Sequence, residues 1–242
     1  MTSHVNHATG SGTIYRVVSA LMSYPQPELI AALPEIEQAL QGEAALAEAL
    51  PALQPLLHHL QSVPLLTLQE NYVDTFDRSA ALSLHLFEHI HGESRDRGQA
   101  MVDLLEEYRS QGLEPATSEL PDYVPLFLEF LSLLSHDRAA LLLGEAIHVL
   151  AAIGQRLQRR DSPYAAPLLL LTRLTEVVPR EQDDPPVRDM DEAMEVFGPG
   201  ADGVEPLLKP GPGGVQPLHF HTRQHARSAV PSATQSAPGR PA

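Results

Sequence analysis

Apolar residues recur at intervals of three and four along residues 13–178, and this spacing constrains the fold more than any other feature of the sequence. It is the period of amphipathic α-helices. No stretch alternates apolar and polar residues between hairpin turns, as a half-buried strand would. The sequence therefore predicts an all-α, single-domain helical bundle, and 242 residues suffice for a substantial core.

Both ends of the chain differ from this body. Residues 1–12 are rich in Ser, Thr, Gly and His, and we expect them to be disordered. Residues 179–242 are rich in Pro and Gly, and cannot bury enough apolar surface to offset the entropy of ordering them. We therefore predict a disordered tail. Within it, residues 189–197 place apolar side chains at helical spacing, which predicts a short helix that docks on the body or on a partner.

Breakers and caps divide the body into helices. Ser94 and Asp122 are residue types that cap helix N-termini, and Gly92 and Gly112 suit C-termini. Prolines 34, 51 and 55 should kink or split the helices that contain them. The expected helices cover residues 13–24, 28–41, 44–61, 64–76, 82–90, 95–111, 123–134, 137–159 and 163–178.

Charge and cysteine content limit the classes of function. A net charge of -15 argues against nucleic acid and anionic lipid as partners. Without cysteine, the chain has no disulfide, thiolate nucleophile or Cys-ligated metal, and we expect no cofactor. We find no apolar signal region near the N-terminus and no uninterrupted apolar span, so we expect a cytoplasmic protein without direct membrane insertion.

The histidine-rich run in residues 85–91 admits several interpretations. His85, Glu88 and His89 match the H-x-x-E-H pattern of inverted zinc metalloproteases, which suggests a metal-dependent hydrolase. The pattern leaves two positions free, and no third ligand is evident. A second interpretation is a metal that is bound without catalysis, with His91 as a further ligand. A third is that the histidines only bond to nearby carboxylates. We expect no metal here and, without a phosphate loop, nucleophile elbow or dinucleotide fingerprint, no enzyme.

A turn between two predicted helices contains polar groups that can bind a partner protein. It carries His85, Glu88, His89, Glu93, Arg95, Asp96 and Arg97. Loops held by a rigid scaffold carry binding residues more often than helix interiors do. A purely structural cluster of salt bridges is the alternative.

An acidic stripe precedes this turn. Glu70, Asp74 and Asp77 lie at i, i+4 and i+7, beside an apolar face that includes Tyr72 and Phe76 together with Leu68. An apolar groove rimmed by carboxylates suits a basic amphipathic peptide. A solvated face is the alternative.

Further along, Asp122 and Tyr123 precede a strongly apolar helix that contains Glu129. A carboxylate among apolar residues lies on the exposed edge of a helix or is paired, because an isolated buried charge is unfavourable. An arginine of residues 95–97 is a natural partner for Glu129.

Residues 72–78, 83–98, 99–105 and 120–131 resemble the NarJ-type nitrate reductase assembly chaperones, within the TorD/DmsD-like redox-enzyme maturation chaperones. The resemblance extends from about residue 15 to residue 178. It implies a TorD-like helical fold and a dedicated chaperone rather than an enzyme. The implied client is the catalytic molybdenum subunit of a respiratory nitrate reductase, bound in its immature state before molybdenum cofactor insertion and membrane docking.

The resemblance also implies contact with the client's N-terminal segment, and molybdenum cofactor biosynthesis proteins as a second class of partner. A helical scaffold for a different client is the alternative. The candidate client-binding residues are Glu70, Tyr72, Asp74, Phe76, Asp77, His85, Glu88, His89, Glu93, Arg95, Asp96, Arg97, Asp122, Tyr123 and Glu129.

Overall fold

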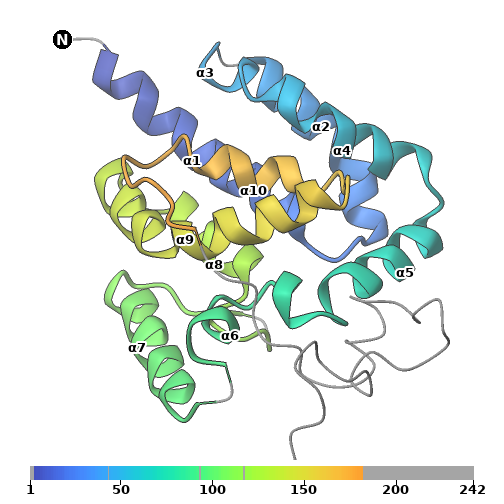
Figure 1. Ribbon diagram of the computed structural model, residues 1–242. Helices are drawn as coiled ribbons and strands as arrows, with labels where there is room; N and C mark the ends of the chain where they lie inside the picture. Colours follow the sequence, from blue (N-terminus) through green and yellow to red (C-terminus); the bar gives the residue numbers. More distant parts are fainter. Residues whose placement is uncertain (1–2, 43, 93, 117, 182–242) are drawn as a thin grey trace, which may run out of the picture. The chain divides into compact units, whose positions relative to one another are not determined.

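A computed structural model describes residues 3–42, 44–92, 94–116 and 118–181, which are helical along most of their length (Figure 1). The elements are α1 (Ser3–Met22), α2 (Pro27–Gly42), α3 (Ala44–Ala47), α4 (Leu50–Ser62), α5 (Leu65–Phe76), the 3₁₀ turn η1 (Ala80–Leu82), α6 (Leu86–His91), α7 (Asp96–Ser110), α8 (Val124–Ser132), α9 (His136–Arg159) and α10 (Ala165–Leu171). In these ranges the β-pairing is a single antiparallel bridge between His85 and Tyr123. The all-α prediction is confirmed.

Helix α9 supplies the centre of the core. Its buried residues cover most of its circumference, and α1, α6, α8, α10 and η1 contact it (Figure 1). Within the described part of the chain, α9 alone is long and apolar enough to cross a membrane, but 72% of its most apolar window is buried inside the protein. A helix that is apolar on most sides suits the interior of a helical body.

Two glycines set the spacing between helices in this core. At Gly154 of α9, an added Cβ would lie 3.0 Å from the side chain of Leu169 on α10. At Gly12 of α1, an added Cβ would lie 3.1 Å from the carbonyl oxygen of Ser132 at the end of α8. Both helix pairs pack closely because these positions lack a side chain.

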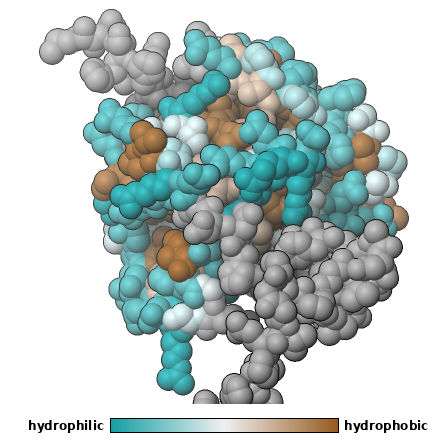
Figure 2. Space-filling model, in the orientation of Figure 1, coloured by the Kyte–Doolittle hydropathy of each residue, from teal (hydrophilic) through white to brown (hydrophobic). Residues whose placement is uncertain are grey.

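Hydrophobic surface on the face shown in Figure 2 is divided into small patches among hydrophilic side chains. Such scattered exposure is ordinary for a folded domain. Among the described residues, the large apolar side chains that are more than half exposed are Leu66, Ile90, Leu133, Leu141 and Val178.

The first helix starts earlier than its composition predicted. Helix α1 begins at Ser3, whereas we expected disorder through residue 12 and a helix from Thr13. A helix adds one hydrogen bond for each residue once it is nucleated, so weak helix formers can extend an existing helix. Gly12 therefore belongs to a packed helix rather than to a linker.

The last helix is shorter than predicted. Helix α10 ends at Leu171, and the chain then turns, with the N–H groups of Arg173 and Leu174 donating to carbonyls three residues earlier. The chain continues to α9, where the Arg180 N–H donates to His148 Nδ1 at 3.0 Å. The predicted disordered tail beyond residue 181 and the predicted helix of residues 189–197 lie outside the described residues.

Of the three prolines expected to kink or split a helix, Pro51 lies beside a break in the chain of helices. The chain breaks between α3 and α4, and Pro51 occupies the first turn of α4, where its missing N–H is tolerated. Pro34 and Pro55 instead lie inside α2 and α4.

Candidate functional site

A layer of tyrosines joins α1, α5 and α8. The Tyr72 hydroxyl of α5 donates to the carbonyl oxygen of Met22 at 2.8 Å. Its oxygen lies 3.0 Å from the hydroxyl of Tyr123, and since the Tyr72 proton is already used, Tyr123 donates this bond. Burial raises the pKa of both phenols, so both are neutral hydrogen-bonding groups.

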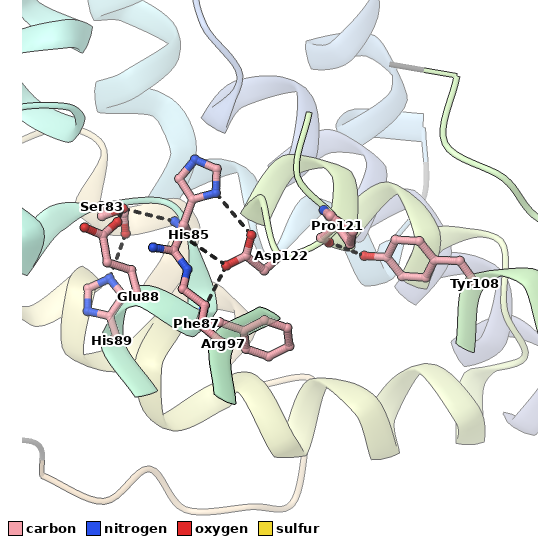
Figure 3. Close-up of polar contacts among 9 residues, drawn as sticks. All are labelled: Ser83, His85, Phe87, Glu88, His89, Arg97, Tyr108, Pro121 and Asp122. Atoms are coloured by element: carbon pink, nitrogen blue, oxygen red, sulfur yellow. Dashed lines mark hydrogen bonds and ion pairs between the residues drawn. The ribbon is translucent and has the colours of Figure 1, made fainter. Parts of the chain in front are cut away.

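Asp122 caps a helix other than the one we predicted. We expected it to cap the helix that follows it, but Tyr123 occupies that position and makes no side-chain cap. Asp122 is fully buried, and its Oδ2 accepts the N–H of Phe87 at 3.1 Å (Figure 3). Its carbonyl accepts the N–H of Leu86 at 3.0 Å. Asp122 therefore satisfies the first turn of α6 from a distant part of the sequence, which favours a carboxylate there.

An imidazole and a guanidinium face the same carboxylate. His85 Nδ1 lies 3.2 Å from Asp122 Oδ1, and Arg97 Nη2 lies 3.9 Å from Oδ2 (Figure 3). The Nε of Arg97 is buried and has no hydrogen-bond partner in the described structure. Asp122 thus links the starts of α6 and α7 to the entry of α8.

A second network holds the segment before α6. The Ser83 hydroxyl donates to Glu88 Oε2 at 2.5 Å, and the backbone N–H of His85 donates to Ser83 Oγ at 3.3 Å (Figure 3). His89 Nε2 lies 2.8 Å from the Ser83 carbonyl, which requires a proton on Nε2. Burial lowers the pKa of His89, so the neutral Nε2–H tautomer makes this bond.

The H-x-x-E-H residues do not assemble a zinc site. Helix α6 begins at Leu86, and His85 precedes it with extended dihedrals, so His85 and His89 are not one helical turn apart on one face. His85 is directed to Asp122, His89 to the Ser83 carbonyl, and Glu88 to the Ser83 hydroxyl. The part of the chain that the structure describes contains no cluster of ligands fit for a metal. This arrangement does not support the metal-dependent hydrolase alternative.

These two networks and the tyrosine layer surround an open depression of about 380 Å³, which we call the tyrosine hollow. Its lining consists of Tyr24, Tyr72, Phe76, Asp77, Ser83, Leu84, His85, Glu88, Glu119 and Tyr123. Six of the sequence-predicted site residues lie in it: Tyr72, Phe76, Asp77, His85, Glu88 and Tyr123. The hollow has an aromatic floor and three carboxylates in its lining, a combination that suits a basic group on an apolar stem.

Other predicted site residues lie outside the hollow. His89, Arg97 and Asp122 support it from behind through the bonds described above. Glu70, Asp74, Arg95, Asp96 and Glu129 are exposed and do not line it. The exposed position of Glu129 agrees with the first of the two placements we considered, and Glu93 lies outside the described residues.

Only part of the acidic stripe of Glu70, Asp74 and Asp77 borders the tyrosine hollow. Asp77 lines the hollow, whereas Asp74 is paired with Arg78 at 3.0 Å. The apolar face beside the stripe is not an open groove, because Leu68, Tyr72 and Phe76 are all at least 96% buried. Leu68 belongs to the core, and Tyr72 and Phe76 line the hollow although little of either residue is exposed.

Sequence reasoning missed four lining residues: Tyr24, Ser83, Leu84 and Glu119. Tyr24 follows α1 and meets Tyr72 edge to face at 5.5 Å between ring centroids. Glu119 stands in the irregular segment between α7 and α8. Ser83 offered a weak signal, since a hydroxyl just before a helix often bonds to the backbone nearby.

Comparison with known proteins shows which family this chain belongs to. A sequence profile described as nitrate reductase delta subunit matches residues 39–169. The chain is 46% identical over 153 residues to a protein of Escherichia coli (strain K12) named "Probable nitrate reductase molybdenum cofactor assembly chaperone NarW", covering 63% of this chain and 64% of NarW. It is 44% identical over 163 residues to NarJ of the same strain, covering 65% of this chain and 67% of NarJ.

A more distant relative and a solved structure agree. NarJ of Bacillus subtilis (strain 168) is 31% identical over 173 residues, which cover 69% of this chain and 91% of that protein. A crystal structure described as that of "a putative redox enzyme maturation protein" from Archaeoglobus fulgidus has a TM-score of 0.50 at 20% identity. The match covers 67% of this chain and 91% of that one and is a likeness of fold. The chain belongs to the nitrate reductase delta subunit family.

Proposed function

We propose that this protein is a dedicated assembly chaperone for a nitrate reductase and not an enzyme. It binds the immature catalytic subunit and keeps it competent to receive its molybdenum cofactor before that subunit docks at the membrane. One observation carries the proposal, namely the similarity to NarW and NarJ, both named as molybdenum cofactor assembly chaperones. A chaperone of this kind acts by population shift, since it binds the immature conformer better than the mature one.

The tyrosine hollow is the part of the surface that we assign to the client's N-terminal segment. Asp77, Glu88 and Glu119 supply negative charge, and the tyrosine rings in the lining supply apolar area. A basic amphipathic segment matches both properties. The net charge of -15 extends this attraction beyond the hollow.

The place of action follows from the client. A chaperone that meets its client before membrane docking works in the cytoplasm. Proteins that synthesise or deliver the molybdenum cofactor are the second class of partner, because the client must be held open when the cofactor arrives.

Co-purification from cells tests the proposal. The tagged full-length protein should retain the catalytic subunit of nitrate reductase from cells that cannot make molybdenum cofactor, and several-fold less from cells that can. Equal recovery of the subunit from both kinds of cell would contradict a role before cofactor insertion. Recovery of no nitrate reductase subunit would favour the alternative of a scaffold for another client.

Association kinetics test the role of the hollow. Asp77→Asn should slow association with a peptide from the client's N-terminus and flatten the dependence of the on-rate on salt, because surface charges act mainly on encounter. Asp74→Asn is the matched control, since Asp74 lies outside the hollow and is paired with Arg78. Equal effects of the two changes would show that only the overall negative field matters.

A further inference from the structure

A second depression lies on another part of the body, between α4 and α10, with a volume of about 450 Å³. We call it the α4–α10 pocket. Its walls are mainly apolar and come from Ala52, Pro55, Ala165, Ala166, Leu169 and Leu170. Ala52, Ala166 and Leu169 are only partly buried, so apolar surface remains uncovered there. Covering such surface is favourable by about 25 cal/mol for each Å² removed from water.

The polar rim of this pocket carries one arginine and one carboxylate, and a second arginine lies next to it in the sequence. Arg173 lines the pocket, and Arg160 directly precedes Asp161, a lining carboxylate. The side chains of Arg160 and Arg173 are exposed and form no ion pair with any carboxylate of the described residues. A ligand with an apolar stripe and a negatively charged flank would match the walls and the rim together.

Residues 189–197 of this chain have that chemistry. Met190, Ala193, Met194 and Phe197 fall at the spacing of one helical face. The remaining positions include Asp189, Asp191, Glu192 and Glu195, and no basic residue interrupts them. Methionine is unbranched and flexible, which lets it fill an irregular apolar pocket.

The chain is long enough to bring this segment to the pocket. Its last described residues are held beside α9, where the Arg180 N–H bonds to His148. Along α9, His148 and Gln158, a lining residue, are about 15 Å apart at 1.5 Å per residue. The link from Glu181 to Met190 can span about 30 Å when extended. Such tethering also raises the local concentration of the segment to about the millimolar range.

We propose that residues 189–197 dock as an amphipathic helix in the α4–α10 pocket of the same molecule. Met190, Met194 and Phe197 contact the apolar walls, and the acidic face lies toward Arg160 and Arg173. This site is separate from the tyrosine hollow, so docking leaves the surface assigned to the client open. The proposal does not depend on the identity of that client.

Cysteine cross-linking in the full-length protein tests the docking directly, because the natural chain has no cysteine to give background. The test variant carries Ala166→Cys in the pocket and Met194→Cys in the segment. The matched control carries Ala100→Cys, a half-buried position on α7, with the same Met194→Cys. After treatment with a short bismaleimide, we expect an intramolecular cross-link in the test pair at a yield at least fivefold above the control.

Two further variants of the cross-linking pair test the chemistry. Phe197→Asp, which removes an apolar contact, should lower the yield several-fold. Arg160→Glu with Arg173→Glu should also lower it, and should do so more at low salt than at high salt. These arginines are exposed, so the helical circular dichroism should not change.

Each contrary result overturns the proposal. A yield in the test pair no higher than in the control would show that the pocket is not occupied by this segment. Cross-linked dimers in place of cross-linked monomers would show that a second copy supplies it. An unchanged yield after both arginine substitutions would remove the charge complementarity on which the choice of this segment rests.

Discussion

The tyrosine hollow and the α4–α10 pocket are depressions of similar size built by different interactions. The hollow rests on directional bonds among Tyr72, Tyr123, Ser83, Glu88 and the Asp122 network behind it. The pocket rests on packing between α9 and α10, where Gly154 allows close approach. Removing single polar atoms around the hollow should therefore lower the free energy of unfolding. Around the pocket, changes in side-chain volume should lower it.

The largest effect should come from Asp122→Ala. This change removes the cap of α6 and leaves Arg97 and His85 without their carboxylate, and breaking a buried pair typically costs about 3 kcal/mol or more. Urea unfolding followed by circular dichroism measures the free energy. Asp122→Asn keeps an acceptor for the Phe87 N–H and should cost less. If both variants lost less than about 1 kcal/mol, the hollow would not depend on this carboxylate.

A larger side chain at the contact between α9 and α10 tests the region of the α4–α10 pocket. Gly154→Val should destabilise the protein by about 2 kcal/mol, because the added atoms must displace Leu169. Gly98→Ala on α7 is the control, since its Cβ would meet no atom within 4 Å and should stabilise the helix by roughly 0.5 kcal/mol. The same thermal or urea unfolding experiment serves for both, and a neutral Gly154→Val would show that α10 can move away from α9.

Single hydroxyl groups distinguish the regions further. Tyr72→Phe removes two hydrogen bonds and leaves the Met22 carbonyl without that donor, so it should cost about 2 kcal/mol. Tyr123→Phe removes one bond and should cost about 1 kcal/mol.

Tyr164 provides the matched control for these two changes. It packs on Tyr72 and Phe76 near the start of α10, but its buried hydroxyl has no hydrogen-bond partner in the described structure. Tyr164→Phe should leave the free energy of unfolding unchanged or raise it. A loss equal to that of Tyr72→Phe would contradict the view that these hydroxyl groups stabilise the protein through their hydrogen bonds.

The smallest effect should appear as a dependence on pH. Burial lowers the pKa of His89 in the folded protein below its ordinary value of 6.5. The unfolded chain takes up a proton as the pH falls below about 6.5 while folded His89 stays neutral, so its contribution to stability is complete above that pH and declines below it. His89→Gln should flatten this decline between pH 7 and pH 5 in urea titrations.

His59 on α4 allows a comparison with His89. Burial lowers its pKa as well, but it is less enclosed. His59→Gln should flatten the same decline less than His89→Gln does. A larger effect of His59→Gln would mean that the Ser83 network relaxes when His89 is protonated.

The sequence revealed the helices and part of the hollow because both signals are local. Apolar spacing indicates which residues face inward, and this predicted the all-α body and a helix over residues 137–159, which is α9 in the structure. Tyr72, Asp77, His85 and Glu88 were found because they are close together in the sequence. The role of Asp122 was predicted for the wrong helix, since a residue can cap a helix start that lies far away along the chain. Tyr24 and Glu119 were missed for the same reason, because only the tertiary fold brings them to the hollow.

The bond of Asp122 to the start of α6 has a consequence for how the chain can vary in length. Leu86 and Asp122 are held together at the base of a long excursion that contains α6, α7 and the irregular segment before α8. The entropy lost in closing such a loop grows only with the logarithm of its length, so doubling it costs about 0.6 kcal/mol. Insertions between α7 and α8 should therefore be tolerated far better than insertions of equal size within the closed base, which makes this excursion a place where relatives can diverge in size while the body stays the same.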